Sequence, residues 1–165
     1  MSLSWQERID AVWADTTLSD AERIAAIDDV AAERGESDPV ALFERGGARD
    51  SAGIEYEAVA LYRRALEAGL PELQRVQASV QLASTLRNLG EVSESIRLLQ
   101  AERANAHRHG LADAVEAFYA LALASDDRPV EAAAVALAAL APHLPQYSRS
   151  VRAYADELSS LRSEN

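Results

Sequence analysis

Histidine and carboxylate side chains are the groups in this sequence that could perform acid–base chemistry or bind a metal. His107 and His109 are two residues apart, a spacing that places them about 200° apart on a helix. They could share one metal ion only if the helix has ended before Gly110, with Asp113 as the nearby acidic ligand. His143 stands between two prolines, in an expected loop, and has no evident partner. Structural or solvent-exposed histidines are therefore favoured over metal ligands.

The motifs of common enzymes are absent from the sequence. It contains no cysteine, which excludes disulfides, thiolate metal sites and a thiol nucleophile. A Gly-rich phosphate loop, Gly-x-Ser-x-Gly and His-Glu-x-x-His are also absent. Acidic pairs such as Asp28–Asp29, Asp126–Asp127 and Asp156–Glu157 are expected at helix ends or on solvent-facing surfaces. We therefore predict a protein without enzymatic activity, metal or cofactor.

Composition and charge favour a helical protein that avoids polyanions. The 165 residues are 48% hydrophobic, much of it alanine, and include only 7 Gly and 5 Pro. A formal net charge of −11 opposes binding to nucleic acid and to anionic membranes. No segment approaches the ~20 apolar residues of a membrane span, and the start lacks a basic-then-apolar signal pattern. These features predict a cytoplasmic protein, and the absence of lysine beside abundant alanine is typical of GC-rich bacterial genomes.

A repeat with a period of 37 residues runs through the sequence. It aligns a turn position with small residues seven positions before it and five positions after it. The three sets are Gly53, Gly90 and Asp127 at the turn; Gly46, Ala83 and Ala120 before it; and Ala58, Ser95 and Ala132 after it. Small side chains at fixed positions allow two helices to cross closely. A looser match places Trp5, Ile9, Ala21 and Ile24 in an N-terminal repeat.

Helix-start and helix-stop residues divide the chain between these positions. Ser19 with Glu22 is typical of a capping box, and Asp38–Pro39 of an N-cap followed by a first helical residue. Pro71 and Pro145 are also expected near helix starts, and Gly35, Gly69, Gly90 and Gly110 near helix ends. We predict nine helices, at 4–14, 19–34, 39–52, 55–68, 72–89, 92–108, 111–125, 129–140 and 146–162.

The segment from Glu55 to Leu66 resembles the second helix of a tetratricopeptide repeat, with Ala58, Tyr62 and Ala65 at its small-aromatic-small positions. The segment 81–90 is similar to the first helix of the next repeat. Over roughly residues 5–158 the chain resembles the short bacterial tetratricopeptide proteins of group 5. The period departs from the family's usual value of about 34 residues, and Arg49 replaces an aromatic residue of the first repeat.

The resemblance implies an all-α fold, a right-handed superhelix of antiparallel helix pairs with about nine helices and a C-terminal capping helix. We expect one domain over residues 1–165. It would comprise a degenerate helix pair at 1–37, repeats at 38–70, 71–110 and 111–141, and the capping helix with a tail at 142–165.

The resemblance also implies a concave groove lined by the first helix of each pair. The groove positions are Asp10, Trp13, Phe43, Gly47, Asp50, Gln77, Gln81, Ser84, Arg87, Asn88, Phe118 and Leu121. Their amide, guanidinium and aromatic groups could bind an extended peptide. The alternative is that they are ordinary surface residues, with Trp13 and Phe118 in the core. Arg87 and Asn88 could hold a carboxylate and a peptide amide, or bond within the protein.

The carboxylate clamp with which some members of the family bind acidic chaperone tails is not present. Its positions correspond to Phe43, Gly47, Gln81, Ala114 and Phe118, none of which is cationic. We therefore predict a non-catalytic scaffold that binds a different protein or peptide in the groove.

Two alternatives remain at this stage. In the first, the chain is a homo-oligomer, such as a homodimer, with no peptide ligand. Its contact would be the amphipathic last helix, which carries Tyr147, Val151, Tyr154, Leu158 and Leu161. In the second, it is a small-molecule sensor with a pocket between Trp13, Phe43 and Arg87.

Overall fold

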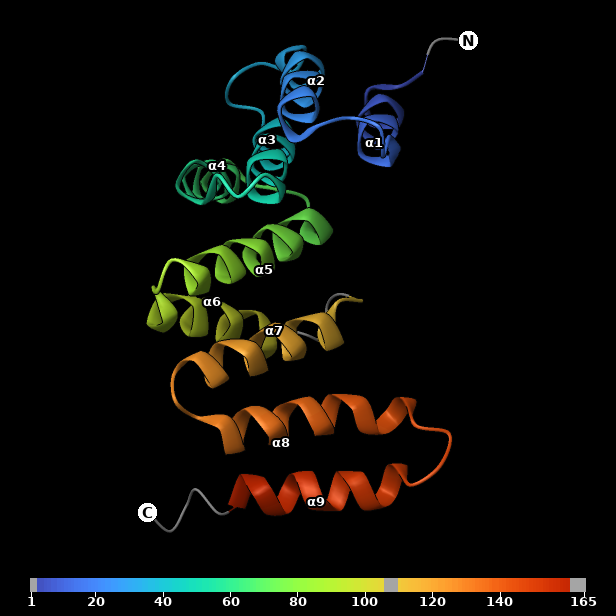
Figure 1. Cartoon of the computed structure of the whole chain (residues 1–165), viewed down its shortest axis with the longest axis vertical. Coiled ribbons are helices and arrows are strands. Elements are labelled where there is room, and N and C mark those ends of the chain that lie inside the picture. The colour runs from blue at the N-terminus through green and yellow to red at the C-terminus, as the bar shows by residue number, and fades with distance from the viewer. Residues whose placement is uncertain (1–2, 106–109, 161–165) are drawn as a thin grey trace. The chain divides into compact units, whose positions relative to one another are not determined.

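A computed structural model describes residues 3–105 and 110–160, and all regular secondary structure in these ranges is helical. Figure 1 shows the helices in chain order. They are α1 (Trp5–Ala14), α2 (Asp20–Ala32), α3 (Pro39–Ser51), α4 (Glu55–Ala68), α5 (Glu72–Asn88), α6 (Val92–Ala104), α7 (Ala112–Ser125), α8 (Pro129–Leu140), the 3-10 turn η2 (Ala141–His143) and α9 (Ser148–Ser160).

All nine predicted helices are found in the described ranges, so the all-α prediction is confirmed. Their ends agree with the prediction within two residues wherever both ends are described. The predicted ends at 108 and 162 lie outside the described residues; α6 itself ends at Ala104 and is capped at Asn105.

The helices form two compact units, Met1–Thr85 and Leu86–Asn165, whose boundary falls inside α5. In the first unit α2 packs against α1 and α3, and α3 packs against α4. In the second unit α7 packs against α6 and α8, and α8 packs against α9 (Figure 1). Within each unit, helices that follow one another in the sequence are therefore neighbours in space, as short connections require.

The predicted capping signals are confirmed in the first unit. The hydroxyl of Ser19 accepts a hydrogen bond from the backbone N–H of Glu22, whose carboxylate accepts one from the N–H of Ser19 at 2.9 Å. Asp38 caps α3 by accepting from the N–H of Ala41 at 2.9 Å, and Pro39 occupies the first turn of that helix. These contacts satisfy N–H groups that have no partner inside a helix.

The three turn positions of the repeat share one backbone geometry. Gly53, Gly90 and Asp127 have φ angles of 74°, 86° and 54°, in the left-handed region where glycine is unstrained and aspartate is tolerated. The residue after each turn donates its N–H to a carbonyl five positions earlier. These bonds are Ile54 to Arg49 at 2.9 Å, Glu91 to Leu86 at 2.8 Å, and Arg128 to Leu123 at 3.0 Å. The predicted period is thus confirmed as one type of helix end used three times.

The small residues at the repeat positions are buried. Gly46, Ala83 and Ala120 are buried, as are Ala58, Ser95 and Ala132. A Cβ atom at Gly46 would lie only 2.8 Å from two ring carbons of Tyr62, which is fully buried. The crossing of α3 and α4 therefore needs glycine at this position.

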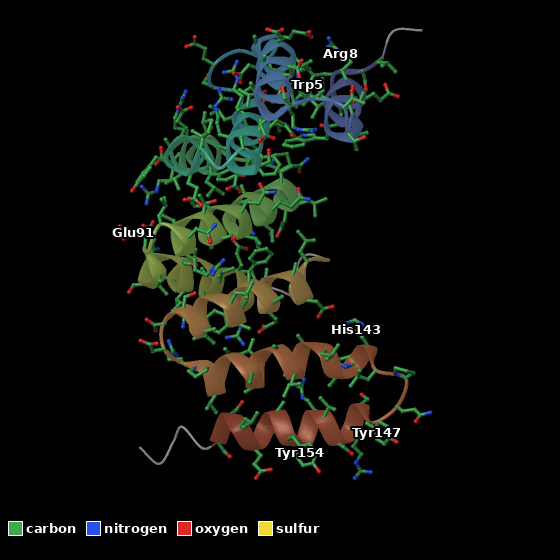
Figure 2. All side chains as sticks on the ribbon, viewed as in Figure 1. Trp5, Arg8, Glu91, His143, Tyr147 and Tyr154 are labelled. Atoms are coloured by element: carbon green, nitrogen blue, oxygen red, sulfur yellow. The ribbon has the colours of Figure 1, made fainter. Side chains whose placement is uncertain are left out.

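The N-terminal helix pair is joined to α3 by a shared core of Ile9, Ile27 and Ala48. Trp5 packs against this core, and its indole N–H donates to the carbonyl of Val30 at 2.8 Å. Figure 2 shows Trp5 together with Arg8, which pairs with Glu33, the residue that caps the end of α2. Trp5 is therefore a packing residue that anchors α1 to α2.

Arg49, which replaces an aromatic residue of the repeat pattern, joins three helices through ion pairs. Its guanidinium binds both oxygens of Asp28 of α2, at 2.8 and 2.7 Å, and lies 3.4 Å from Glu57 of α4. Arg45 adds a 3.5 Å contact to the same Asp28 carboxylate. Asp28, which was expected at a helix end or on a solvent-facing surface, lies inside α2 and is partly buried beneath two arginines of α3.

Within the described residues, no helix is both long enough and apolar enough to cross a membrane.

Candidate partner-binding cleft

The first unit contains an open cleft of about 580 Å³, formed by α1, α3, α4 and α5. Seven of the predicted groove residues line it: Asp10, Trp13, Phe43, Gly47, Asp50, Gln77 and Gln81. The other lining residues are Gln6, Glu44, Ser51, Tyr62 and Gln74. The cleft thus combines aromatic rings, amides and carboxylates.

Helical periodicity explains why these residues share one cavity. The lining residues of α1 are 6, 10 and 13, and those of α5 are 74, 77 and 81, so each set has the spacing of one helix face. The other faces of these helices are apolar and buried, as at Ile9, Val76 and Ala78. Burial of these apolar residues turns the polar stripes of α1 and α5 toward the cleft.

Trp13 and Glu44 form one polar contact in the cleft. The indole N–H of Trp13 donates to Glu44 Oε2 at 2.8 Å, and the ring also packs against the Ile9 core. Burial raises the pKa of Glu44, an effect that the hydrogen bond from Trp13 opposes and the charge of Asp10 reinforces. Gly47 leaves room for the ring, because a Cβ atom there would lie 3.3 Å from it. Trp13 is therefore both a core residue and a cleft residue.

Asp50 lies at the meeting point of α3, α4 and α5. It accepts hydrogen bonds from the Tyr62 hydroxyl at 3.2 Å and from Thr85 Oγ1 at 2.9 Å. Thr85 Oγ1 is also 2.9 Å from the carbonyl of Gln81, so its single proton serves one acceptor at a time. Burial raises the pKa of Asp50 more than these hydrogen bonds lower it.

The remaining predicted groove residues are not brought into this cleft. Ser84 is partly buried in α5 and is not a lining residue. Arg87, Asn88, Phe118 and Leu121 belong to the second unit. There Arg87 donates to Asn88 Oδ1 at 2.9 Å, and Phe118 is partly buried whereas Leu121 is exposed. The extension of the groove beyond the first unit stays a prediction, as does the sensor pocket that includes Arg87.

The second unit holds a smaller cleft of about 380 Å³, between α7, α8 and α9. Its lining includes several small residues of α8 and the ion pair between Arg103 and Glu116, at 2.8 Å. The guanidinium of Arg103 also lies 4.2 Å from the ring centroid of Tyr119. Because this arginine already has an anionic and an aromatic partner, the second cleft offers less free binding capacity than the first.

His143 has a partner, contrary to the expectation from the sequence. Its Nε2 lies 3.0 Å from Asp113 Oδ2, because η2 places the histidine beside the start of α7 (Figure 2). His107 and His109 lie outside the described residues. Among the residues that are described, no group of three or more histidine, cysteine or acidic side chains could hold a metal ion.

Sequence reasoning missed several lining residues, among them Gln6, Glu44 and Gln74. Each has a signal in the sequence, because it lies three or four positions from a predicted groove residue of the same helix. Glu44 precedes Gly47 by three positions, and Gln74 precedes Gln77 by three. A search for polar residues at helical spacing would have included them.

Glu44→Gln is expected to stabilise the protein at neutral pH. In the folded wild type, the pKa of Glu44 is raised above the ordinary 4.5. Ionised Glu44 therefore destabilises the native state at pH values above this raised pKa. This cost disappears as the native carboxyl is protonated on falling pH. A glutamine oxygen can still accept from Trp13 and carries no charge. The urea midpoint of the variant should exceed that of the wild type at about pH 7.5 and match it at about pH 4. An equal difference in urea midpoint at both pH values would contradict a raised pKa of Glu44 in the native state.

A family model described as Tetratrico peptide repeat matches residues 39–158, which is most of the chain. Comparisons with curated proteins and with solved structures give no match. Tetratricopeptide repeats generally mediate protein–protein interaction and typically act as non-enzymatic scaffolds. The match begins at α3, so α1, which forms one wall of the cleft, precedes the matched segment. Together with the helix ends repeated at 53, 90 and 127, the match shows that this chain belongs to the tetratricopeptide repeat family.

Proposed function

We propose that the chain is a non-catalytic scaffold whose first-unit cleft binds an extended segment of a protein partner. The observation that carries this proposal is the cleft of about 580 Å³, in which the partly exposed ring of Trp13 and four glutamines line one cavity together with the buried rings of Phe43 and Tyr62. Glutamine amides both donate and accept hydrogen bonds, as an extended peptide backbone requires, and aromatic rings accept apolar side chains.

The position of the lining residues on helices also supports binding. Side chains on packed helices lose little conformational freedom when a ligand arrives, so most of the ordering cost falls on the partner. The family's usual role agrees with this reading. The net charge of −11 supports a partner other than nucleic acid or an anionic membrane. We propose that this partner is met in a bacterial cytoplasm.

Selection from a random peptide display library tests this function directly. The wild type should enrich a common set of peptides, and Gln77→Ala/Gln81→Ala should lose them, because both residues line the cleft. Gln100→Ala/Gln146→Ala is the matched control, because it removes two exposed glutamines that do not line the cleft, and it should retain them. Enrichment of no common sequence by the wild type, or equal enrichment by the Gln77→Ala/Gln81→Ala variant, would contradict cleft binding.

Self-association through α9 is the second candidate function. Tyr147 and Tyr154 are 76% and 63% exposed; Figure 2 shows Tyr154 on α9 and Tyr147 at the connection just before that helix. Exposed aromatic side chains on and beside one helix are suited to a symmetric contact between two copies. Sedimentation velocity over a wide concentration range tests this function. A wild type that stays monomeric throughout would exclude it, and a dimer lost in Tyr154→Ser would support it.

A further inference from the structure

The cleft carries negative charge that the protein itself does not neutralise. Asp10, Glu44 and Asp50 line it, and among the described lining residues there is no arginine. Elsewhere in the described chain, three partly buried carboxylates are paired with arginine. These pairs are Asp28 with Arg49 at 2.7 Å, Glu116 with Arg103 at 2.8 Å, and Glu131 with Arg128 at 2.8 Å. The carboxylates of the cleft therefore lack the arginine partner that these three carboxylates have.

Only neutral groups donate hydrogen bonds to the two partly buried carboxylates of the cleft, Glu44 and Asp50. Glu44 accepts from the indole of Trp13, and Asp50 accepts from the hydroxyls of Tyr62 and Thr85. An ionised carboxylate can accept about four hydrogen bonds, so both retain acceptor capacity. Burial without a cation raises the pKa of each, which means that a bound cation would relieve an existing cost.

A further acceptor lies in the same cleft. Gln81 Oε1 is buried and receives no hydrogen bond from the described residues. A buried acceptor without a donor is costly, and a ligand that brings N–H groups would satisfy it once the Gln81 amide turns toward the cleft. The chemistry lacking in the cleft is therefore a positively charged group with several donors.

Aromatic surface accompanies these acceptors. Trp13 is partly exposed in the cleft, and indole is the aromatic group that binds cations best. Arg23 of this protein already lies 5.9 Å from the Trp13 ring centroid, which shows that the ring accepts a guanidinium. Arginine combines a planar cation, five N–H donors and an affinity for aromatic faces, whereas lysine offers a compact ammonium.

We infer that the cleft recognises an arginine side chain of the partner segment, held by Asp10, Glu44 and Asp50 beside Trp13. This inference rests on the proposed function and adds to it the chemistry of the anchor residue. The ligand class is a peptide with an internal arginine. The carboxylate clamp uses cationic protein side chains to bind an anionic tail, whereas this cleft would use anionic side chains to bind a cation.

NMR titration with N-acetyl-arginine N-methylamide tests the inference, because this probe has neutral ends and one positive charge. The chain has two tryptophans, so the indole N–H region contains one reporter in the cleft, Trp13, and one outside it, Trp5. The Trp13 signal should shift to saturation while the Trp5 signal stays nearly constant. The neutral citrulline analogue should bind at least about tenfold more weakly, and the lysine analogue should fall between them.

Variants with equal charge changes separate the cleft from the general acidity of the chain. Glu44→Gln/Asp50→Asn should weaken arginine binding by about tenfold or more. Glu67→Gln/Asp29→Asn removes the same groups from exposed positions in the first unit and should have little effect in salt that screens distant charges. Asp10→Asn changes an exposed residue, so it should reduce binding several-fold without risk to folding.

The outcomes distinguish this inference from the proposed function. Equal binding of the arginine and citrulline probes, or equal losses in the two double variants, would overturn arginine recognition. Peptide selection that depends on Gln77 and Gln81 would still support the proposed function in that case. An absence of selected peptides together with a shifted, saturating Trp13 signal would instead support a cationic ligand other than a peptide and overturn the inference as stated.

Discussion

Gly46→Ala should lower the free energy of unfolding by about 2 kcal/mol. The new Cβ atom would lie 2.8 Å from the Cδ1 and Cε1 atoms of Tyr62, whose side chain is fully buried and cannot move aside. Overpacking of this kind costs roughly 1–3 kcal/mol, and so close a contact belongs near the upper end. Alanine returns about 0.5–1 kcal/mol through its better helix propensity, which leaves the net loss stated.

The neighbouring Gly47 supplies the matched control for this prediction. Both glycines lie inside α3, so both alanine substitutions gain the same helix propensity. A Cβ atom at Gly47 would lie 3.3 Å from Trp13 Cζ2, and Trp13 is partly exposed and can adjust. Gly47→Ala should therefore be neutral or slightly stabilising. Urea unfolding followed by tryptophan fluorescence measures both, because Trp5 and Trp13 lie in the first unit. Equal midpoints for the two variants would refute the argument from the close crossing.

Arg49→Met should lower the free energy of unfolding by about 2 kcal/mol, measured in the same assay. It removes the two-pronged contact to Asp28 and the contact to Glu57, while the aliphatic part of the side chain is kept. Hydrogen bonds to charged groups contribute roughly 1.5–3 kcal/mol. The side chain of Arg49 is 16% exposed, so solvent screens its pairing with Asp28 less than it screens a surface pair. Arg45 remains near Asp28 and limits the loss.

Two further variants separate geometry from charge. Arg49→Lys keeps the positive charge and cannot contact both oxygens of Asp28 as a planar fork, so its stability should lie between wild type and Arg49→Met. Arg97→Met breaks an ion pair with Glu94 in which the arginine side chain is 70% exposed, and it should cost less than about 0.5 kcal/mol. A wild-type midpoint for Arg49→Met would show that the three-helix ion cluster does not stabilise the first unit.

Local signals explain why the helices could be predicted from the sequence. A capping box such as Ser19–Glu22 acts over three residues, and a helix end such as Gly53 acts over five. Each signal depends only on residues that are close in the sequence, so it can be recognised without knowledge of the tertiary fold. The Gly46 position was also predictable, because its equivalents at 83 and 120 carry small residues as well.

Contacts between residues far apart in the chain could not be predicted in this way. Arg49 meets Asp28 across 21 positions, and His143 meets Asp113 across 30. Neither pair has a spacing that implies contact, since each depends on how separate helices pack. The same reason limited the cleft prediction. Residues at helical spacing were found on α1, α3 and α5, whereas the charge balance of the cavity became clear only when those faces were brought together.

Under the proposed function, the wall formed by α1 would act as a specificity element that precedes the matched segment. The family match covers residues 39–158, and the loop around Gly35 joins the earlier helix pair to that segment. Exchange of residues 1–37 between two such chains would replace Gln6, Asp10 and Trp13 together and leave the helix ends at 53, 90 and 127 in place. Under the proposed function, recombination at this joint would change binding preferences while the repeats stay unchanged, provided that the new helix pair keeps the contacts of Ile9 and Ile27 with Ala48.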